Sequence, residues 1–247
     1  MNGCMEPSDS NGLRCAVFGA SGGIGAALAE QLCARADVAE VHGIARDPAR
    51  VPSGAIPHRF DLTSEASIAK ACAAIGEPLD LVLVATGRLT RESGDGPEKS
   101  WRTLDADAMA ELYAINAIGP ALIAKHTLPL LRKQGKPVFA AISAKVGSIA
   151  DNRLGGWHSY RASKAALNML VRNFAIELGR TNPRAVAVTL HPGTVDTPLS
   201  QPFQRNVAEG KLFTPEISAA KLLQVIAGLD TVDSGRLFAW DGAEIPF

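Results

Sequence analysis

Hydrophobic and polar positions divide the chain into two alternating kinds of segment. Short apolar runs of strand length are followed by longer segments in which apolar residues recur at helical spacing. The pattern predicts strands at residues 15–18, 41–45, 56–60, 79–85, 138–142, 185–190 and 236–239. It predicts helices at residues 24–34, 64–75, 107–132, 159–180 and 215–229.

Residue types at the segment ends refine these boundaries. Thr63 precedes the second helix as its expected N-cap, and Thr214 followed by Pro215 is typical of a helix start. Pro120 predicts a bend inside the long helix 107–132. Regular alternation of strand and helix, without repeats or long linkers, predicts one α/β domain with a doubly wound parallel sheet of about seven strands flanked by helices. In such sheets ligands bind at the carboxyl ends of the strands.

Composition narrows the choice of partners. Lys and Arg number 25, as do Asp and Glu, so the net charge of zero gives no reason to expect a nucleic acid or an anionic membrane as partner. No apolar run is long enough to span a membrane, and residues 1–12 lack the apolar core of a signal peptide. We therefore expect a cytoplasmic protein with a flexible N-terminal extension at 1–12 and a single domain at 13–247. The four cysteines form no CxxC pair, and we expect neither a metal site nor a disulfide framework.

A glycine-rich turn follows the first predicted strand and opens the first helix. It reads Phe-Gly-Ala-Ser-Gly-Gly-Ile-Gly over residues 18–25. Gly19 permits the tight turn, Gly23 lets backbone approach a pyrophosphate, and Gly25 lets the helix pack closely. The free N–H groups of the helix start attract phosphate. The turn therefore predicts a dinucleotide site and a Rossmann fold.

The end of the second strand indicates which dinucleotide is bound. An NAD site usually has a carboxylate there, which bonds the ribose hydroxyls. This chain has Ala45 in that place, followed by Arg46. Because Arg forms charge-assisted bonds to phosphate, Arg46 favours NADP(H), and Ser21 offers a further hydroxyl donor. The alternative is that Arg46 is a solvated surface residue beside Asp47.

Tyr160 and Lys164 stand four residues apart at the start of a predicted helix, so their side chains share one face. A nearby ammonium favours the phenolate and lowers the pKa of a tyrosine. A tyrosine tuned in this way can act as general acid in reduction and as general base in oxidation. An exposed helix with a solvated lysine is the alternative interpretation.

Together, the Gly-xxx-Gly-x-Gly turn and the Tyr-xxx-Lys segment resemble the short-chain dehydrogenase/reductase family, over residues 14 to about 240. The segment 146–157, the His-Pro-Gly-Thr-Val-Asp-Thr run at 191–197 and Trp-Asp-Gly at 240–242 resemble its C-factor and Sniffer branch, which includes carbonyl reductases. The resemblance implies hydride transfer between NADP(H) and a carbonyl or alcohol, in a homodimer or homotetramer paired through helices 107–132 and 159–180.

The resemblance also implies roles for individual residues. Catalysis would involve Tyr160, Lys164, Ser143 and Asn116, the last bending its helix and holding a water that relays protons to the lysine. The cofactor would be bound by Gly19, Ser21, Gly23, Ile24, Gly25, Arg46, Asp61, Leu62, Ala85, Thr86, Gly87, Tyr160, Lys164, Pro192, Gly193, Val195 and Thr197. Residues 198–213 would form a lid over the substrate. His191 is expected to be structural.

The sequence departs from the family pattern at two places. Counting back from Gly147, the usual serine position falls on Ala144, so either Ser143 serves through a bulge, or Ser148 substitutes, or the site works with weakened polarisation. The usual Asn-Asn-Ala-Gly is replaced by Val-Ala-Thr-Gly at 84–87. These departures favour, as the second hypothesis, a nucleotide-binding signalling protein with vestigial catalysis.

Two further points concern the substrate. A sugar-nucleotide epimerase is disfavoured, because the glycine spacing differs and only about 50 residues follow the sixth predicted strand. The expected pocket residues are apolar, which suggests an uncharged or aromatic carbonyl. They are Leu89, Leu154, Trp157, Leu199 and Phe203.

Overall fold

The computed structural model describes residues 12–76, 78–91, 96–201, 204 and 210–247. In the first half, strands and helices follow one another in nearly regular alternation. They are β1 (Leu13–Phe18), α1 (Gly23–Cys33), β2 (Val38–Ala45), the 3-10 turn η1 (Pro48–Arg50), β3 (Ile56–Arg59), α2 (Glu65–Ile75) and β4 (Leu81–Val84). The expected extension 1–12 lies outside the described residues except for Gly12.

The second half carries the two longest helical segments. Its elements are η2 (Trp101–Thr103), α3 (Ala106–Tyr113), the π-helical turn η3 (Ala114–Ile118), α4 (Gly119–Thr127), η4 (Leu128–Leu130), β5 (Val138–Ile142), η5 (Lys145–Gly147), α5 (His158–Thr181), β6 (Val186–His191), β7 (Thr194–Val195), β8 (Leu212–Phe213), α6 (Pro215–Gly228), η7 (Thr231–Asp233), β9 (Leu237–Ala239) and β10 (Glu244–Ile245).

Eight strands form one sheet in the order β10-β9-β6-β5-β4-β1-β2-β3. All neighbours pair in parallel except β9 and β10. The strand order reverses between β1 and β4, which makes this the switch point of the doubly wound sheet. The predicted α/β class with a parallel Rossmann-type sheet is therefore confirmed, with β10 as an additional antiparallel edge strand.

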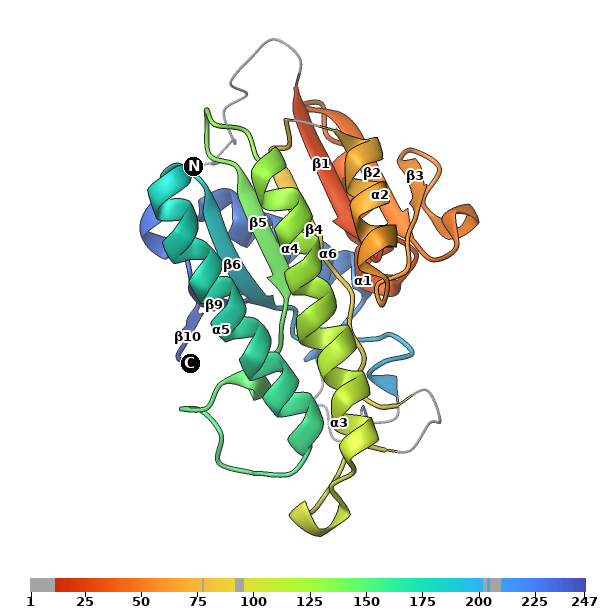
Figure 1. Cartoon of the computed structure of the whole chain (residues 1–247), viewed down its shortest axis with the longest axis vertical. Helices are drawn as coiled ribbons and strands as arrows, with labels where there is room; N and C mark the ends of the chain where they lie inside the picture. The colour runs from red at the N-terminus through yellow and green to blue at the C-terminus, as the bar shows by residue number, and fades with distance from the viewer. Residues whose placement is uncertain (1–11, 77, 92–95, 202–203, 205–209) are drawn as a thin grey trace.

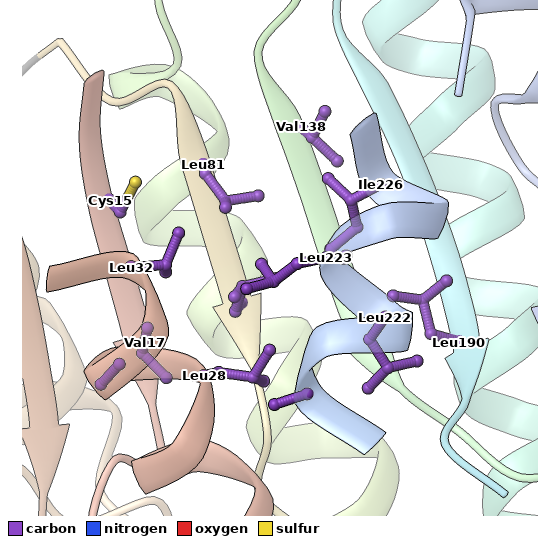
Figure 2. Packing of buried hydrophobic residues seen from close by; sticks show 14 of the residues in the cluster. Cys15, Val17, Leu28, Leu32, Leu81, Val138, Leu190, Leu222, Leu223 and Ile226 are labelled. Atoms are coloured by element: carbon purple, nitrogen blue, oxygen red, sulfur yellow. The ribbon is translucent and has the colours of Figure 1, made fainter. Parts of the chain in front are cut away.

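Helices cover both faces of the sheet (Figure 1). On one face α1 and α6 pack side by side, with Leu28, Leu32 and Leu222 against Val17 and Leu190 of the strands (Figure 2). The other face is covered by α2, α4 and α5 and has its own buried cluster. Because both faces are buried, β4 is a continuous run of apolar residues rather than an alternating one.

The structure differs from the sequence prediction in three respects. The N-cap of α2 is Ser64, whose hydroxyl accepts from the Ser67 N–H, so Thr63 lies one residue too early. The helix expected at 107–132 is interrupted by the π-helical turn at Ala114–Ile118, ahead of Pro120. The short strands β7, β8 and β10 have two residues each, too few for a period to be recognised in the sequence.

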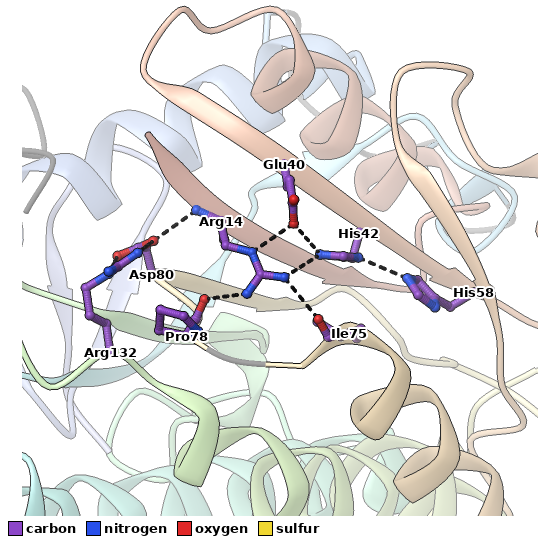
Figure 3. Close-up of polar contacts among 8 residues, drawn as sticks. All are labelled: Arg14, Glu40, His42, His58, Ile75, Pro78, Asp80 and Arg132. Atoms are coloured by element: carbon purple, nitrogen blue, oxygen red, sulfur yellow. Dashed lines mark hydrogen bonds and ion pairs between the residues drawn. The ribbon is translucent and has the colours of Figure 1, made fainter. Parts of the chain in front are cut away.

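A network of charged groups lies away from the switch-point end, near the beginning of β1 and β4 (Figure 3). The Asp80 carboxylate accepts two bonds from the Arg132 guanidinium, at 2.6 and 3.1 Å, and one from the Arg14 N–H at 2.9 Å. The Arg14 guanidinium in turn bonds Glu40 at 2.8 Å and thereby lowers the pKa of that carboxyl. This network ties β1, β2 and β4 to the segment after α4.

No helix in the described part of the chain is long and apolar enough to cross a membrane.

Candidate active site

The glycine-rich turn lies between β1 and α1, at the switch point. Gly19 adopts φ +87°, a left-handed conformation that favours glycine. A Cβ on Gly25 would lie 2.1 Å from the Gly19 carbonyl oxygen, so the first turn of α1 packs directly on the glycine turn. The N-cap of α1 is Gly22, which supplies no side-chain cap. The helix start therefore leaves its N–H groups available to an anion.

One cavity, of about 470 Å³, extends from this turn toward the ends of β2 and β3. Ser21, Arg46 and Leu62 line it, together with Ala85, Thr86 and Gly87 after β4. The exposed Arg46 follows Ala45, the last residue of β2. Asp61 also lines the cavity, and its carboxylate accepts bonds from the N–H and hydroxyl of Thr63 at 2.9 and 2.7 Å. These bonds, with a smaller contribution from Arg46, lower the pKa of Asp61.

Tyr160 and Lys164 lie on the first two turns of α5, and both side chains are buried. The Lys164 ammonium donates to the Ile142 carbonyl at 2.7 Å, which connects α5 to the end of β5. Burial raises the pKa of the Tyr160 phenol and lowers the pKa of Lys164 to about 7. Both shifts disfavour the charged form of the group. A charge of opposite sign placed next to either group would therefore strongly favour its ionised form.

Asn116 is fully buried inside the π-helical turn. Its side chain accepts from the Arg88 N–H and donates to the Arg88 carbonyl, both at 2.8 Å, and donates to Ser163 at 3.0 Å. Ser163 in turn donates to the Tyr160 carbonyl at 2.8 Å. A Cβ on Gly87 would lie 3.3 Å from Asn116 Oδ1 and 3.4 Å from Lys164 Nζ. The asparagine therefore lies close to the lysine, across Gly87.

Ser143, Ala144 and Ser148 are the three residues that bear on the expected position of the catalytic serine. Ser143 follows β5 and is buried, and its hydroxyl donates to Asn168 Oδ1 at 2.7 Å. Asn168 lies one turn after Lys164 on the same face of α5. Ala144 packs with Tyr160 in a small apolar cluster. Ser148 is engaged elsewhere, since its hydroxyl bonds the Pro246 carbonyl and accepts from the Asp151 N–H.

A second cavity, of about 280 Å³, brings these groups together. Ser143, Tyr160 and Lys164 all line it, and it shares Ala85, Thr86 and Gly87 with the first cavity. The loop after β6 completes the wall with residues Pro192, Gly193, Val195 and Thr197, and Ile24 of α1 also contributes. The two cavities thus meet at the end of β4.

At Gly193 the loop after β6 packs closely against two aromatic rings. It has φ +78°, and a Cβ there would lie 2.7 Å from the Phe213 ring and 3.1 Å from the Trp240 ring. His191, just before the loop, lines the second cavity, and burial lowers its pKa to about 4. The expected lid at 198–213 is described only in part, because residues 202–203 and 205–209 lie outside the described residues.

Most of the expected pocket residues lie where the sequence predicted. Leu89, Trp157 and Leu199 line the second cavity. Leu154 does not, since it is 90% exposed on the loop before α5, and this expectation was wrong. Phe203 lies outside the described residues. Sequence reasoning missed Ser163 and Asn168, although Asn168 continues the four-residue spacing from Tyr160 through Lys164.

The residues present fit a dinucleotide. A Cβ on Gly19, which has φ +87°, would lie 3.0 Å from the Ala85 backbone, so this position needs glycine, and a Cβ on Gly23 would lie 2.8 Å from the Thr197 methyl group. The Thr86 hydroxyl, where the two cavities meet, is buried without a hydrogen-bond partner in the described residues. Such an unsatisfied buried group is the kind that a ligand atom satisfies.

Comparisons with known proteins agree with this geometry. The family model for short chain dehydrogenases matches residues 14–208. Curated relatives include C-signal of Myxococcus xanthus, 39% identical over 58% of this chain and 81% of that protein, and 1-hydroxy-2-glutathionyl-2-methyl-3-butene dehydrogenase of Rhodococcus, 34% identical over 74% and 76%.

Similar solved structures include carbonyl reductases. The NADPH-bound carbonyl reductase from chicken fatty liver has a TM-score of 0.81 and 26% identity, covering 97% of this chain and 96% of its own. The carbonyl reductase Sniffer of Drosophila melanogaster shares the fold, with a TM-score of 0.80 and 21% identity over 97% and 100%. From the matched family model, the glycine turn and the fold, this chain belongs to the short-chain dehydrogenase/reductase family of oxidoreductases.

Proposed function

We propose that the chain is an NADP(H)-dependent oxidoreductase that transfers a hydride between the nicotinamide and a carbonyl or alcohol, with Tyr160 as general acid and base. One observation carries this proposal. Tyr160 and Lys164 are buried in a cavity that meets the glycine-turn cavity at Ala85, Thr86 and Gly87. A dinucleotide in the first cavity would therefore place its reactive end beside the phenol.

The proposed reduction balances through two transfers. NADPH, when bound, supplies the hydride that reaches the carbonyl carbon. The Tyr160 phenol donates its proton to the carbonyl oxygen, which leaves an alcohol and a phenolate. Lys164 stabilises that phenolate by its positive charge, because an opposite charge lowers the pKa that burial raises. Oxidation of an alcohol follows the same route in reverse.

The remaining polar residues would prepare the site. Ser143 is the proposed donor to the substrate oxygen, and for this its hydroxyl must turn away from Asn168. Asn116 would hold a water that connects Lys164 to solvent. The proposed binding residues for the cofactor are those on the glycine turn, at the end of β4 and in the loop after β6.

Preference for NADP(H) over NAD(H) rests on Arg46. The guanidinium lines the first cavity at the end of β2, where a carboxylate would otherwise repel a 2′-phosphate. We would titrate the protein with NADPH and with NADH, following the fluorescence of the reduced nicotinamide. Tighter binding of NADPH that Arg46→Ala removes would support the proposal. Arg50→Ala, an exposed arginine four residues later, is the matched control.

Turnover is tested with a panel of carbonyl compounds of apolar or aromatic character. Tyr160→Phe keeps the ring and removes the hydroxyl, so it should bind NADPH and fail to reduce any compound. Retained activity in Tyr160→Phe would refute the assigned role. Failure of the wild-type protein to bind either nucleotide would refute the cofactor assignment.

A second candidate is a nucleotide-binding signalling protein with little catalysis. It is favoured by the bond that engages the Ser143 hydroxyl and by the similarity to C-signal. In that case NADPH binds while the carbonyl panel gives no turnover.

A homodimer or homotetramer is also proposed. Ile118, Met169 and Ile176 are between 47% and 62% exposed on the helical face formed by η3 and α5. Burial of this face between copies would remove apolar surface from water. Light scattering of the wild type and of Met169→Glu tests it, since a charge at that face should favour the monomer.

A further inference from the structure

The catalytic helix α5 begins without a cap from its own residues. Its N-cap residue, Trp157, has φ 52° and supplies no side-chain hydrogen bond. An N-cap side chain would normally accept a bond from the N–H of the second or third helical residue. Here the second residue is Ser159, and its N–H donates to Oε2 of Glu98 at 3.3 Å.

Glu98 lies 61 residues earlier, in the connection between β4 and α3, and it holds this helix end through three contacts. Besides the bond from the Ser159 N–H, its Oε1 accepts from the Ser159 hydroxyl. Its backbone carbonyl accepts from the Trp157 N–H. Ser159 is fully buried, so both of its contacts are shielded from water. Glu98 thus caps α5 from outside the helix.

We propose that Glu98 is a positioning residue for Tyr160, which fixes the start of α5 and brings a carboxylate to the residue before the phenol. This inference rests on the proposed function of Tyr160. Tyr160 directly follows Ser159, and its ring contacts Trp157 edge-to-face with centroids 6.4 Å apart. Of the two residues that Glu98 holds, Ser159 directly precedes Tyr160 in sequence and Trp157 contacts its ring.

The same connection also shapes the cavity. It leaves β4 through Thr86 and Gly87, contributes Leu89 to the cavity wall, and reaches α5 at Glu98. The connection between β4 and α3 therefore contains both the residues at which the two cavities meet and Glu98, which caps α5. Loss of the Glu98 contacts should displace Tyr160 relative to Lys164 and lower kcat more than it changes KM.

The charge of Glu98 has a separate effect. The positive end of the α5 dipole favours a phenolate at Tyr160, whereas an ionised carboxylate bonded to Ser159 opposes it. Among the described residues, the other charged or titratable groups that line the same cavity are Lys164 on the same helix, Lys145 and His191. Lys145 is 3.5 Å from Asp151. Arg161, next to Tyr160, directs its guanidinium to the Val146 carbonyl.

Three variants separate the two effects. Glu98→Gln keeps an oxygen acceptor for Ser159 and removes the charge. Glu98→Ala removes both. Glu177→Gln makes the same charge change on an exposed residue of α5, about 25 Å along the helix from Tyr160. The measurement is the pH dependence of kcat for alcohol oxidation, which rises as the phenol ionises.

Glu98→Gln should move this profile to lower pH and keep most of the plateau rate. Glu98→Ala should lower kcat about fivefold or more, the equivalent of a lost cap, with KM nearly unchanged. Glu177→Gln should leave the profile in place. An unchanged profile in Glu98→Gln, or an equal shift in Glu177→Gln, would overturn the proposal.

A second readout does not depend on turnover. The chain has two tyrosines, Tyr113 and Tyr160, so in a Tyr113→Phe background ultraviolet absorption reports Tyr160 alone. At one alkaline pH at which circular dichroism shows both proteins folded, Glu98→Gln should ionise a larger fraction of Tyr160 than the parent. Equal fractions would overturn the electrostatic part even if no substrate were found. Absence of turnover with a clear difference in ionisation would count against the proposed function and leave the role of Glu98 intact.

Discussion

Replacement of Lys164 by methionine should stabilise the protein at neutral pH while it removes the proposed activity. Lys164 is 3% exposed, and its ammonium donates to the Ile142 carbonyl at 2.7 Å. Burial lowers its pKa from 10.5 to about 7. At about 1.36 kcal/mol per pH unit, that difference corresponds to a penalty of about 5 kcal/mol on the charged form in the folded protein.

The sign of the pH dependence follows from proton binding. Between pH 7 and about 10.5 the unfolded chain keeps the lysine proton and the folded chain releases it, so wild-type stability rises with pH. The penalty is largest below pH 7, remains about 4 kcal/mol at pH 7 and falls below about 1 kcal/mol at pH 10. Methionine has a similar length and no charge, but it leaves the Ile142 carbonyl without its donor, at a cost of about 1–3 kcal/mol.

The expected net gain for Lys164→Met is therefore about 2 kcal/mol at pH 7 and turns into a small loss at pH 10. Urea unfolding without cofactor measures it, and with an m-value of about 3 kcal/mol/M the midpoint should rise by roughly 0.7 M at pH 7. Lys133→Met, at an exposed lysine, is the control. A variant less stable than wild type at pH 7, or a difference that does not vary with pH, would refute the reasoning.

Three other changes have defined expected outcomes. Ser143→Ala should lower kcat/KM about 10²-fold, because it removes a donor to the developing oxyanion. An effect below twofold, together with a gain of activity in Ala144→Ser, would place the polarising position at 144 instead. Asp80→Ala should reduce the free energy of unfolding, measured by urea unfolding, by about 3–5 kcal/mol, because the carboxylate and its Arg132 partner are only 8% and 15% exposed. A loss under about 1 kcal/mol would contradict a buried ion pair. Gly25→Ala should weaken NADPH binding at least about tenfold in the fluorescence titration, because the added Cβ would lie 2.1 Å from the Gly19 oxygen and must displace the turn. Unchanged affinity would show that the turn does not contact the cofactor.

Local patterns in the sequence were sufficient for the fold class and for part of the site. The alternation of apolar strands with amphipathic helices depends on short-range periodicity, so the order of β1 to β6 and the helices between them could be predicted. The glycine turn and the pair formed by Tyr160 and Lys164 are also local. The first lies within one strand-to-helix connection, and the second lies within two turns of one helix. Their spacing alone predicts which side chains share a face.

The tertiary structure decided which groups those side chains meet. Ser143 reaches Asn168 across 25 residues, and Ser159 reaches Glu98 across 61. Asp80, a single charge beside an apolar strand, finds its partner Arg132 52 residues later. The long helix has its π-helical turn at Asn116, where the family resemblance placed a bend, rather than at Pro120, and there the Asn116 side chain bonds the Arg88 backbone 28 residues away. Local periodicity determines secondary structure and the faces of each element, but the partner of a buried polar group depends on packing between segments that are far apart in the chain.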